Sequence, residues 1–426
     1  MSAPGLETRC AGRGAVPALE TQEDLTSAVA SFMTLRPEGR AYVDDPYPLF
    51  ARLLTEAPAH KTSLGPWLVT RHADIDRLGR RDLLSRQAVE QRFQGLSEDS
   101  PMVRLTAAAL NFHNPPDHTR LRSLVSKGFT PRGVTAWRPM ITALVDDLLA
   151  GIAGRDEIDV LGDFAIAVPM QVICQLLGIP YEFHESSMRY VDALVRMLEP
   201  GPKSPELWQE ADSIAAQTYD EVAGYVAERS RHLGDDVLSG LITASEGDDR
   251  LTRDEIIGQV LNLHIAGYET TANLIANTVL TLLRNPDQLA LLQSDPSLIT
   301  GAVEEGLRYE SPARTVLASP AERDIELESA TIPAGDSVIL VVAAANRDPA
   351  VFDDPGRFDI TRSPNPHIAF SSGYHFCLGA HLARLESQSA IGALLQRFPA
   401  MSLATDDVRW RASWTLRALE RLPVRL

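Results

Sequence analysis

The segment best suited to chemistry is FSSGYHFCLG, residues 370–379, in which glycines lie on both sides of a single cysteine, Cys377. A thiolate stays ionised only near hydrogen-bond donors or positive charge. The backbone amides of a glycine-containing loop that leads into a helix provide such donors, and a coordinated metal ion deprotonates a thiol outright. These features make Cys377 a candidate metal ligand. The other residues with fixed spacing in this segment are Phe370, Gly373, His375 and Gly379.

Two other interpretations of Cys377 are open from the residues alone. It could be a small buried apolar side chain, the commonest fate of a free cysteine. It could also be a nucleophile with His375 or His381 as its base. The chain has three cysteines, Cys10, Cys174 and Cys377, and no CxxC pair. We therefore expect no disulfide framework, and any cysteine function belongs to one thiol.

A polar interruption marks a second candidate site. The apolar run around residues 260–265 is followed by AGYETT, residues 266–271, and a glycine inside a helix costs about 1 kcal/mol relative to alanine. A local defect in an otherwise good helix suggests a functional site. The alternative is an exposed helical turn whose polar side chains are satisfied. The candidate residues are Ala266, Gly267, Glu269 and Thr270.

Asn262 lies four residues before Ala266, so on a helix the two residues face nearly the same side. An amide among apolar residues needs a hydrogen-bond partner if it is buried. That partner could be a neighbouring side chain or carbonyl group. It could also be a hydroxyl or carbonyl group of a ligand, in which case Asn262 and Ile265 would be candidate ligand contacts.

Two further pairs share a helical face. His118 and Arg122 are four residues apart, and Glu305 and Arg308 are three apart. Each pair could be an ordinary solvated surface pair, which contributes little to stability.

Helices must position most of these residues. Thr252 and Glu255 form a capping box ahead of a helix over residues 251–284, which would be about 50 Å long at 1.5 Å per residue. Residues 86–110 are expected to be less regular. Apolar residues at three- and four-residue spacing predict several packed helices over residues 131–247, broken at Gly151, Gly178, Pro180 and Gly201. A last helix is expected over about residues 379–396.

The remaining chain predicts a minor β region. No repeat or shift in composition marks a second domain, so we expect one mainly α domain over residues 21–426, after a tail at residues 1–20. Strand-like stretches with adjacent turn signals are residues 66–70, 331–333 and 337–342.

Composition argues against several classes of protein. The 426 residues include 57 acidic and 40 basic side chains, a formal charge of −17, which disfavours nucleic acid or an anionic membrane as the main partner. Hydrophobic residues make up 44% and charged residues 23%, as in globular proteins. We find no signal peptide and no run of about 18 apolar residues. We therefore expect a soluble, cytoplasmic protein.

The pattern FxxGxHxCxG resembles the haem-binding signature of the cytochrome P450 superfamily, and the similarity to its soluble bacterial members extends from about Asp45 to the C-terminus. The resemblance implies the triangular, mostly α haem-thiolate fold with haem b as cofactor. It implies that Cys377 is the axial thiolate, which favours O–O cleavage, and that Phe370 packs near the sulfur. By the same resemblance the groups that bind the haem propionates are His118, Arg122 and His375.

The resemblance also assigns roles to the helical motifs. Ala266 and Gly267 would let haem and O2 approach the long helix, and Glu269 and Thr270 would be the acid and alcohol that deliver protons. Glu305 and Arg308 would match the family's ExxR element. Together with Arg357 of PGRF they would have a structural role in the core.

Two departures from the family's pattern are visible. Ser371 stands where glycine is common, which affects loop geometry. Another propionate-binding arginine is usual about ten residues after the ExxR arginine, but this chain has Leu317 and Ala318 there. Arg314 or Arg323 could substitute from a shifted position.

The expected reaction is insertion of one oxygen atom from O2 into a small, secondary-metabolite-like molecule. No GxGxxG motif follows a strand, so we expect a ferredoxin-type donor with its reductase, docking near Lys127, and a monomeric enzyme. The pocket should be lined by residues 86–110 and 184–205. Alternatives are a peroxide-using or isomerising haem-thiolate enzyme, a non-catalytic haem sensor and a haem-free cysteine nucleophile.

Overall fold

The computed structural model describes residues 24–35, 39–81, 83–86, 93, 96–198, 203–246 and 249–426. The expected tail at residues 1–20 and Cys10 lie outside these ranges, as do residues 87–92, 94–95 and 199–202 of the expected pocket segments. The α-helices are α1 (Leu25–Thr34), α2 (Arg40–Asp44), α3 (Tyr47–Glu56), α4 (His72–Arg80), α6 (Pro101–Ala108), α7 (Asp117–Val125), α8 (Pro131–Ala136), α9 (Arg138–Ile152), α10 (Ala167–Leu177), α11 (Phe183–Leu198), α12 (Pro205–Arg231), α13 (Val237–Thr243), α14 (Arg253–Arg284), α15 (Pro286–Ser294), α16 (Ile299–Tyr309), α17 (Val342–Ala345) and α18 (Ala380–Arg397).

The strands are short and form small sheets. The largest sheet has the order β1-β2-β9-β6, in which β2 and β9 are parallel and the other pairs are antiparallel. A second sheet has the order β10-β11-β3, and β4-β5 and β7-β8 form hairpins. The strands are β1 (Ala59–Lys61), β2 (Trp67–Val69), β3 (Glu157–Asp159), β4 (Ser245–Glu246), β5 (Asp249–Arg250), β6 (Val316–Pro320), β7 (Ile325–Glu326), β8 (Thr331–Ile332), β9 (Ser337–Leu340), β10 (Ser402–Leu403) and β11 (Pro423–Arg425).

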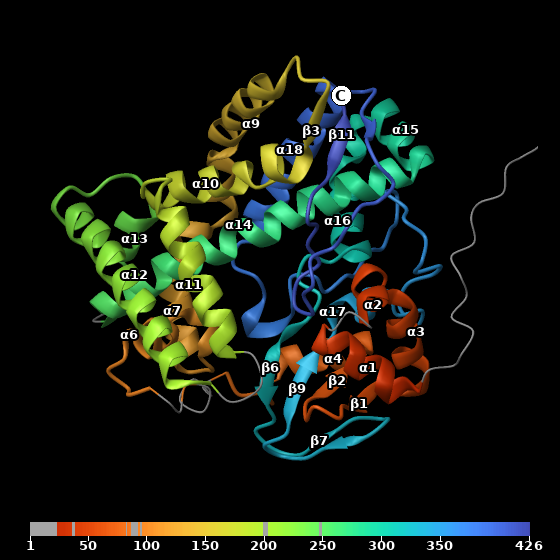
Figure 1. Ribbon diagram of the computed structural model, residues 1–426. Helices are drawn as coiled ribbons and strands as arrows, with labels where there is room; N and C mark the ends of the chain where they lie inside the picture. Colours follow the sequence, from red (N-terminus) through yellow and green to blue (C-terminus); the bar gives the residue numbers. More distant parts are fainter. Residues whose placement is uncertain are drawn as a thin grey trace, which may run out of the picture.

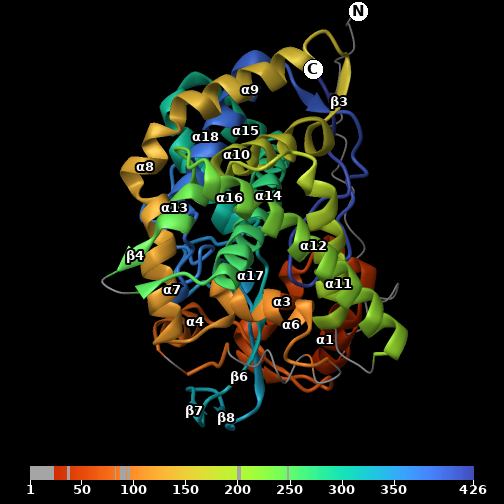
Figure 2. The same ribbon diagram turned by 90° about the vertical axis from the view of Figure 1, so that its left-hand side faces the viewer.

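The long helix α14 is the central element. The expected capping box is present: the Thr252 hydroxyl accepts from the Glu255 N–H at 3.2 Å, and the Glu255 carboxylate accepts from the Thr252 N–H at 2.7 Å. In Figures 1 and 2, α14 passes through the middle of the molecule, with α9, α10 and α18 towards one end and the four-stranded sheet towards the other. It packs against α6, α10, α16 and α18. One helix therefore spans the fold and carries the polar interruption into its interior.

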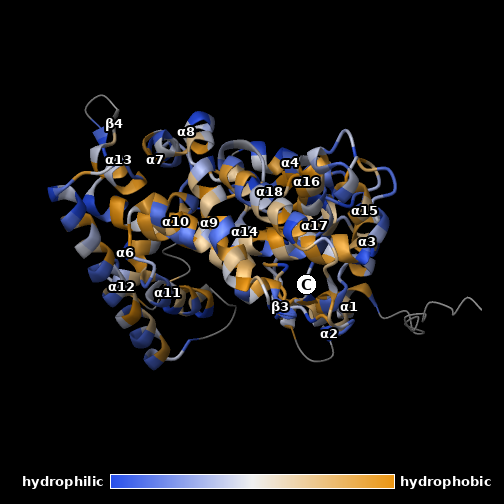
Figure 3. Ribbon diagram, turned by 90° about the horizontal axis from the view of Figure 1, so that it is seen from above, coloured by the Kyte–Doolittle hydropathy of each residue, from blue (hydrophilic) through white to orange (hydrophobic). Residues whose placement is uncertain are grey.

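The hydrophobic core lies around α14. Figure 3 shows this helix as largely hydrophobic at the centre, with hydrophilic residues common on outer helices such as α12. By length and composition alone, the stretch Val160–Leu177 could cross a membrane, but 67% of it is buried within the protein. Burial of that kind is typical of a core helix.

One local prediction was wrong. Residues 101–108 form α6 rather than irregular chain, with Ser100 as N-cap accepting from the Val103 N–H at 3.3 Å. The predicted break at Gly151 is confirmed to within one residue, since α9 ends at Ile152. Gly178 ends α10 in the left-handed conformation, as glycine at this position commonly does.

Candidate active site

A cavity of about 340 Å³ lies between α14 and the segment around Cys377. We call residues 370–379 the cysteine loop. The lining is mostly apolar, with a few polar side chains, as is usual for small-molecule sites. The predicted site residues that line it are Asn262, Ala266, Gly267, Thr270, His118, Arg122, Phe370, His375, Cys377 and Gly379.

The cysteine loop holds Cys377 by its backbone. The Cys377 N–H donates to the Phe370 carbonyl at 2.9 Å, and α18 begins three residues later. Burial raises the pKa of the thiol, against the Gly379 N–H and the charges of Arg122 and Arg384, which lower it. A thiol with a raised pKa is a poor free nucleophile. A coordinated metal ion, which deprotonates the thiol outright, is the better match.

Close packing against α4 fixes the shape of the cysteine loop. Gly373 has a φ of 69°, and a Cβ at this position would overlap the carbonyl oxygen of Gly79. The hydroxyl of Ser372 donates to the Asp76 carbonyl at 3.2 Å. Gly373 therefore has a conformational role in the cysteine loop. It is not part of the cavity lining. Ser371 has a φ of 63°, so the residue that replaces the family's glycine adopts a backbone conformation that favours glycine.

The opposite wall is the middle of α14, which presents Ala266, Gly267 and Thr270 to the cavity. Gly267 also permits close helix packing, because a Cβ there would lie 3.0 Å from Cγ1 of Ile173 on α10. The Thr270 hydroxyl donates to the Ala266 carbonyl at 3.1 Å. With its proton donated to Ala266, the hydroxyl oxygen can still accept a hydrogen bond from a group in the cavity.

Two predicted residues of α14 lie elsewhere. Ile265 is partly buried against the main core and is not part of the cavity lining. The α14 residues that line the cavity recur at three- and four-residue spacing, namely Asn262, Leu263, Ala266, Gly267, Thr270, Thr271 and Leu274. Ile265 falls outside this stripe, so the structure does not support its assignment as a ligand contact. Glu269 also lies outside the lining and forms an ion pair with Arg411 at 3.1 Å. Arg411 was not identified from the sequence, since no local spacing connects residues in such distant segments.

Three nitrogen-bearing side chains gather at one end of the cavity: His118, Arg122 and His375, here called the basic end. The His118 and His375 rings lie 4.4 Å apart between centroids. Arg122 donates to the Tyr374 carbonyl at 3.1 Å. Burial, followed by nearby positive charges, lowers the pKa of His118 to about 4 and that of His375 to about 3.

The basic end fits the propionates of a haem. Both ring nitrogens of His118 and Nε2 of His375 are buried without a hydrogen-bond partner among the described residues. Buried polar atoms are rarely left unpaired, and an N–H of either ring could donate to a carboxylate oxygen of a ligand. A thiol opposite a helix wall, an apolar lining and clustered donors at one end together match a haem held through Cys377.

A second cation lies near the cysteine loop. The Arg384 guanidinium is 4.5 Å from the centroid of the Phe370 ring, and it pairs with both carboxylate oxygens of Glu304 at 2.6 and 2.8 Å. His367 Nε2 also lies 3.0 Å from Glu304. Burial opposes ionisation of Glu304, but the bonds to Arg384 and His367 outweigh it and lower the pKa to about 2. The sequence offered one unused signal, since Arg384 follows Cys377 by two helical turns.

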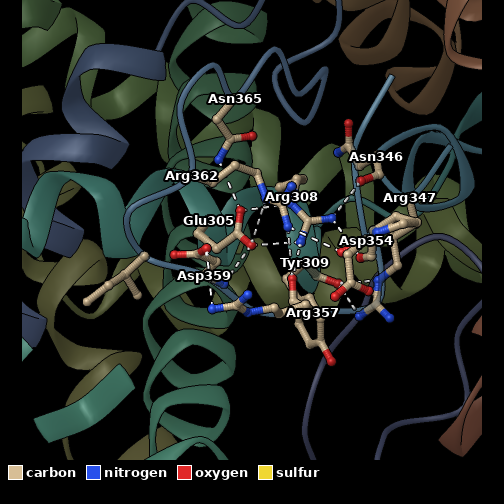
Figure 4. Close-up of polar contacts among 12 residues, drawn as sticks. Glu305, Arg308, Tyr309, Asn346, Arg347, Asp354, Arg357, Asp359, Arg362 and Asn365 are labelled. Carbon is tan, nitrogen blue, oxygen red and sulfur yellow. Dashed lines mark hydrogen bonds and ion pairs between the residues drawn. The ribbon is translucent and has the colours of Figure 1, made fainter. Parts of the chain in front are cut away.

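Glu305 and Arg308 form a buried pair rather than a surface pair. Arg308 donates to both carboxylate oxygens at 2.7 and 2.8 Å, and both side chains are fully buried. Figure 4 shows Arg362 on the other side of Glu305, where its Nε lies 3.2 Å from Oε1. The structural assignment of this pair agrees with the geometry.

The prediction that the Arg357 side chain is the third arginine of this cluster was wrong. The Arg357 side chain is 61% exposed and lies near Asp359, whereas that of Arg362 is 12% exposed and contacts Glu305. Arg357 contributes only its carbonyl group, which accepts from Arg308 at 2.9 Å (Figure 4). The PGRF motif therefore enters the cluster through its backbone.

Neither suggested replacement for the family's further arginine lines the cavity. Arg314 is buried beside Phe32 and donates to the Ser413 carbonyl at 2.8 Å. Arg323 is exposed in a turn between β6 and β7. From the expected pocket segments, Leu110 reaches the cavity, and no described residue of 184–205 does so.

The fold and the site define the class of the protein. The family model described as Cytochrome P450 matches residues 101–410, and the chain belongs to this family, whose members use haem. Cytochrome P450 107B1 from Saccharopolyspora erythraea is 41% identical over 90% of this chain and 96% of its own length. Vitamin D(3) 25-hydroxylase from Pseudonocardia autotrophica is 40% identical over 89% and 93%. The chain is therefore a cytochrome P450 monooxygenase.

A solved structure shows the same fold. The crystal structure of P450BioI in complex with hexadec-9Z-enoic acid ligated acyl carrier protein superimposes with a TM-score of 0.83 at 38% identity, covering 91% of this chain and 99% of that chain. The expected fold class is confirmed.

Proposed function

We propose that this chain inserts one oxygen atom from O2 into a small organic substrate of secondary-metabolite type, using haem b held by Cys377. The other oxygen atom leaves as water, which takes up two electrons and two protons. The observation that carries the proposal is the cavity itself: Cys377 and the polar turn of α14 face the same space, and the basic end closes one side of it. When bound, the haem supplies the activation of dioxygen.

The chain's own residues would bind, orient and supply protons. His118, Arg122 and His375 would hold the propionates. Thr270 would hold a proton at the cavity surface, and Glu269 would transfer protons between solvent and that hydroxyl. This acid and alcohol pair supports an O2-dependent reaction over the peroxide-using alternative.

The substrate would be largely apolar with at least one polar group. Asn262 lines the cavity, and within the described part of the chain its amide hydrogen-bonds to no other residue. An unpaired amide in an apolar wall favours a ligand with a hydroxyl or carbonyl group. The relatives include a vitamin D(3) 25-hydroxylase and a protein crystallised with a fatty acid ligated to acyl carrier protein, and both kinds of molecule combine a large apolar part with polar groups.

Electrons would come from a ferredoxin-type carrier with its own reductase, in the cytoplasm. Lys127 is exposed directly after α7, the helix that carries Arg122. Lys127→Glu should slow reduction of the enzyme by such a carrier, more strongly at low salt, because long-range attraction is screened by salt. The matched control is Lys61→Glu on β1. Equal rates for both variants would remove Lys127 from the docking surface.

The test of the function is spectroscopic and then catalytic. The reduced protein with carbon monoxide should show the absorption of thiolate-ligated haem, and Cys377→Ser should abolish it while Cys174→Ala retains it. A compound library is then screened for a Soret shift, and hits are incubated with O2, ferredoxin and reductase. Product labelled from ¹⁸O2 is expected. A histidine-type spectrum in fresh protein, or label arising only from water, would contradict the proposal.

A further inference from the structure

The basic end lacks positive charge for the ligand proposed above. Haem b carries two carboxylates, but Arg122 is the single arginine or lysine among the described residues that line the cavity. Burial and then the charges of Arg122, His113 and Arg86 lower the pKa of His118 to about 4, which disfavours a positive charge on its ring at pH 7. A carboxylate removed from water needs a paired charge as well as hydrogen bonds. A second cation should therefore lie close to this end.

Arg86 is fixed beside the basic end by its backbone. Its N–H donates to Oδ1 of Asn114 at 3.0 Å, and Nδ2 of Asn114 donates to the Leu84 carbonyl at 3.3 Å. The carbonyl of the same asparagine accepts from the His118 N–H at 3.0 Å. Asn114 is buried. Asn114 thus ties Arg86 through its side chain, and α7, the helix that carries His118 and Arg122, through its backbone carbonyl.

The preceding residues are tied to the sheet. The Ser85 N–H donates to the Pro320 carbonyl at 2.8 Å at the end of β6, and Leu84 forms an isolated bridge with Ala321. The strand β6 contains Ala318, where the sequence lacks the family's arginine. Arg86 is therefore held between α7, which carries two residues of the basic end, and β6, whose Val316 lines the same cavity.

We propose that Arg86, in the segment before α6, is an arginine that binds a haem propionate. It would supply the positive charge that β6 does not provide. A guanidinium suits this role because it binds a carboxylate through two parallel hydrogen bonds and remains charged. Arg314, buried against Phe32, and Arg323, exposed in a turn, do not have this position.

The test compares haem release and reduction potential in purified holoenzymes. Arg86→Gln removes the charge and keeps an amide, Arg86→Lys keeps the charge, and Arg323→Gln is the matched control at an exposed arginine. Haem transfer to excess apomyoglobin should be about tenfold faster from Arg86→Gln than from wild type. This factor corresponds to the loss of about one hydrogen bond to a charged group. The ferric/ferrous midpoint should become more negative, because a nearby positive charge favours the ferrous state. Arg86→Lys should restore the ferric/ferrous midpoint potential and part of the retention of haem.

A second cofactor separates propionate binding from a general effect on the fold. Wild type and Arg86→Gln are reconstituted with haem dimethyl ester, which has no carboxylates, and the difference in release should disappear. An equal difference with haem and its diester, or no difference with haem, would overturn the proposal. The inference rests on the proposed haem cofactor: absence of haem from the wild type would defeat that function, whereas unchanged release from a haem-loaded variant defeats only the role of Arg86.

Discussion

Nη1 of Arg411 lies 3.1 Å from Oε1 of Glu269, so the acid of the expected proton-delivery pair binds the C-terminal part of the chain instead of lining the cavity. The Arg411 side chain is 54% exposed and that of Glu269 is 18% exposed. The carboxylate therefore lies close to solvent, beside Arg411 and next in sequence to Thr270. A proton donor in this position can be recharged from water.

The first prediction compares substitution of Glu269 with substitution of its partner Arg411. Glu269→Gln should slow product formation by roughly 10- to 100-fold, because the group that passes protons is lost. Arg411→Gln removes only an exposed ion pair, worth less than about 1 kcal/mol, and should leave turnover within about threefold. Steady-state turnover and its solvent isotope effect measure both. Equal losses in the two variants would mean that Glu269 acts only as a structural partner.

Thr270→Ala should leave the haem spectrum intact and lower the fraction of electrons recovered in product, because the cavity wall loses its hydroxyl. The missing electrons should appear as hydrogen peroxide or excess water. Product, hydrogen peroxide and the electrons taken from the reductase are measured together. Thr281→Ala, the same change further along α14, is the control, and unaltered coupling in Thr270→Ala would disprove proton delivery by this hydroxyl.

Ser371→Gly should stabilise the protein by about 1 kcal/mol, because a non-glycine residue in the left-handed region carries a steric cost of this size. Urea unfolding of the holoenzyme, followed by circular dichroism and by the Soret band, measures it. Ser372→Gly is the matched control: its φ is −144° and its hydroxyl bonds the Asp76 carbonyl, so that variant should lose stability. Destabilisation of Ser371→Gly would show that its side chain has an unrecognised role.

Glu304→Gln should cost about 2 kcal/mol of stability at pH 7, because its carboxylate pairs with Arg384 and His367. The folded pKa of about 2 lies below the ordinary 4.5, so the stabilisation is complete above about pH 5 and is lost as the pH falls towards 2. The difference from wild type should shrink by about 1 kcal/mol between pH 7 and pH 3.5. Urea unfolding at both values tests this, with the exposed Glu98→Gln as control; a pH-independent difference would contradict it.

Asn262→Leu should weaken binding by about 1 to 3 kcal/mol for ligands that carry the proposed hydroxyl or carbonyl group, with little change for analogues that lack it. Soret-shift titrations of matched ligand pairs provide the comparison. If both kinds of ligand bind equally less tightly, Asn262 only shapes the wall.

The features predictable from the sequence are those with a local signal. The capping box at Thr252 located the start of α14, and the spacing around Cys377 located the site. Asn262 and Ala266 share a face because they are four residues apart. The position of Ile265 was not predictable in this way, because the three- and four-residue stripe that lines the cavity includes Gly267 on one side of Ala266 but not Ile265 on the other.

Contacts between distant segments could not be read from the sequence in this way. Arg357 and Arg362 are five residues apart in one irregular segment, and only the path of the chain decides which of them meets Glu305. The pairing of Arg411 with Glu269 likewise depends on where the C-terminal segment crosses α14. The helix α6 was missed because eight residues provide little periodicity, although Ser100 offered a readable cap.

The packing of Gly373 against Gly79 constrains the order of folding. The neighbouring bond from Ser372 to Asp76 joins residues 296 positions apart, so the thiol-bearing segment reaches its final shape only after both ends of the chain have met. Contacts of such long sequence separation form late, because the entropy of closing the loop must first be overcome. During synthesis the ribosome therefore releases nearly the whole polypeptide before cofactor capture can begin, and a nascent chain stalled after α14 would have its central helix but no means of retaining iron.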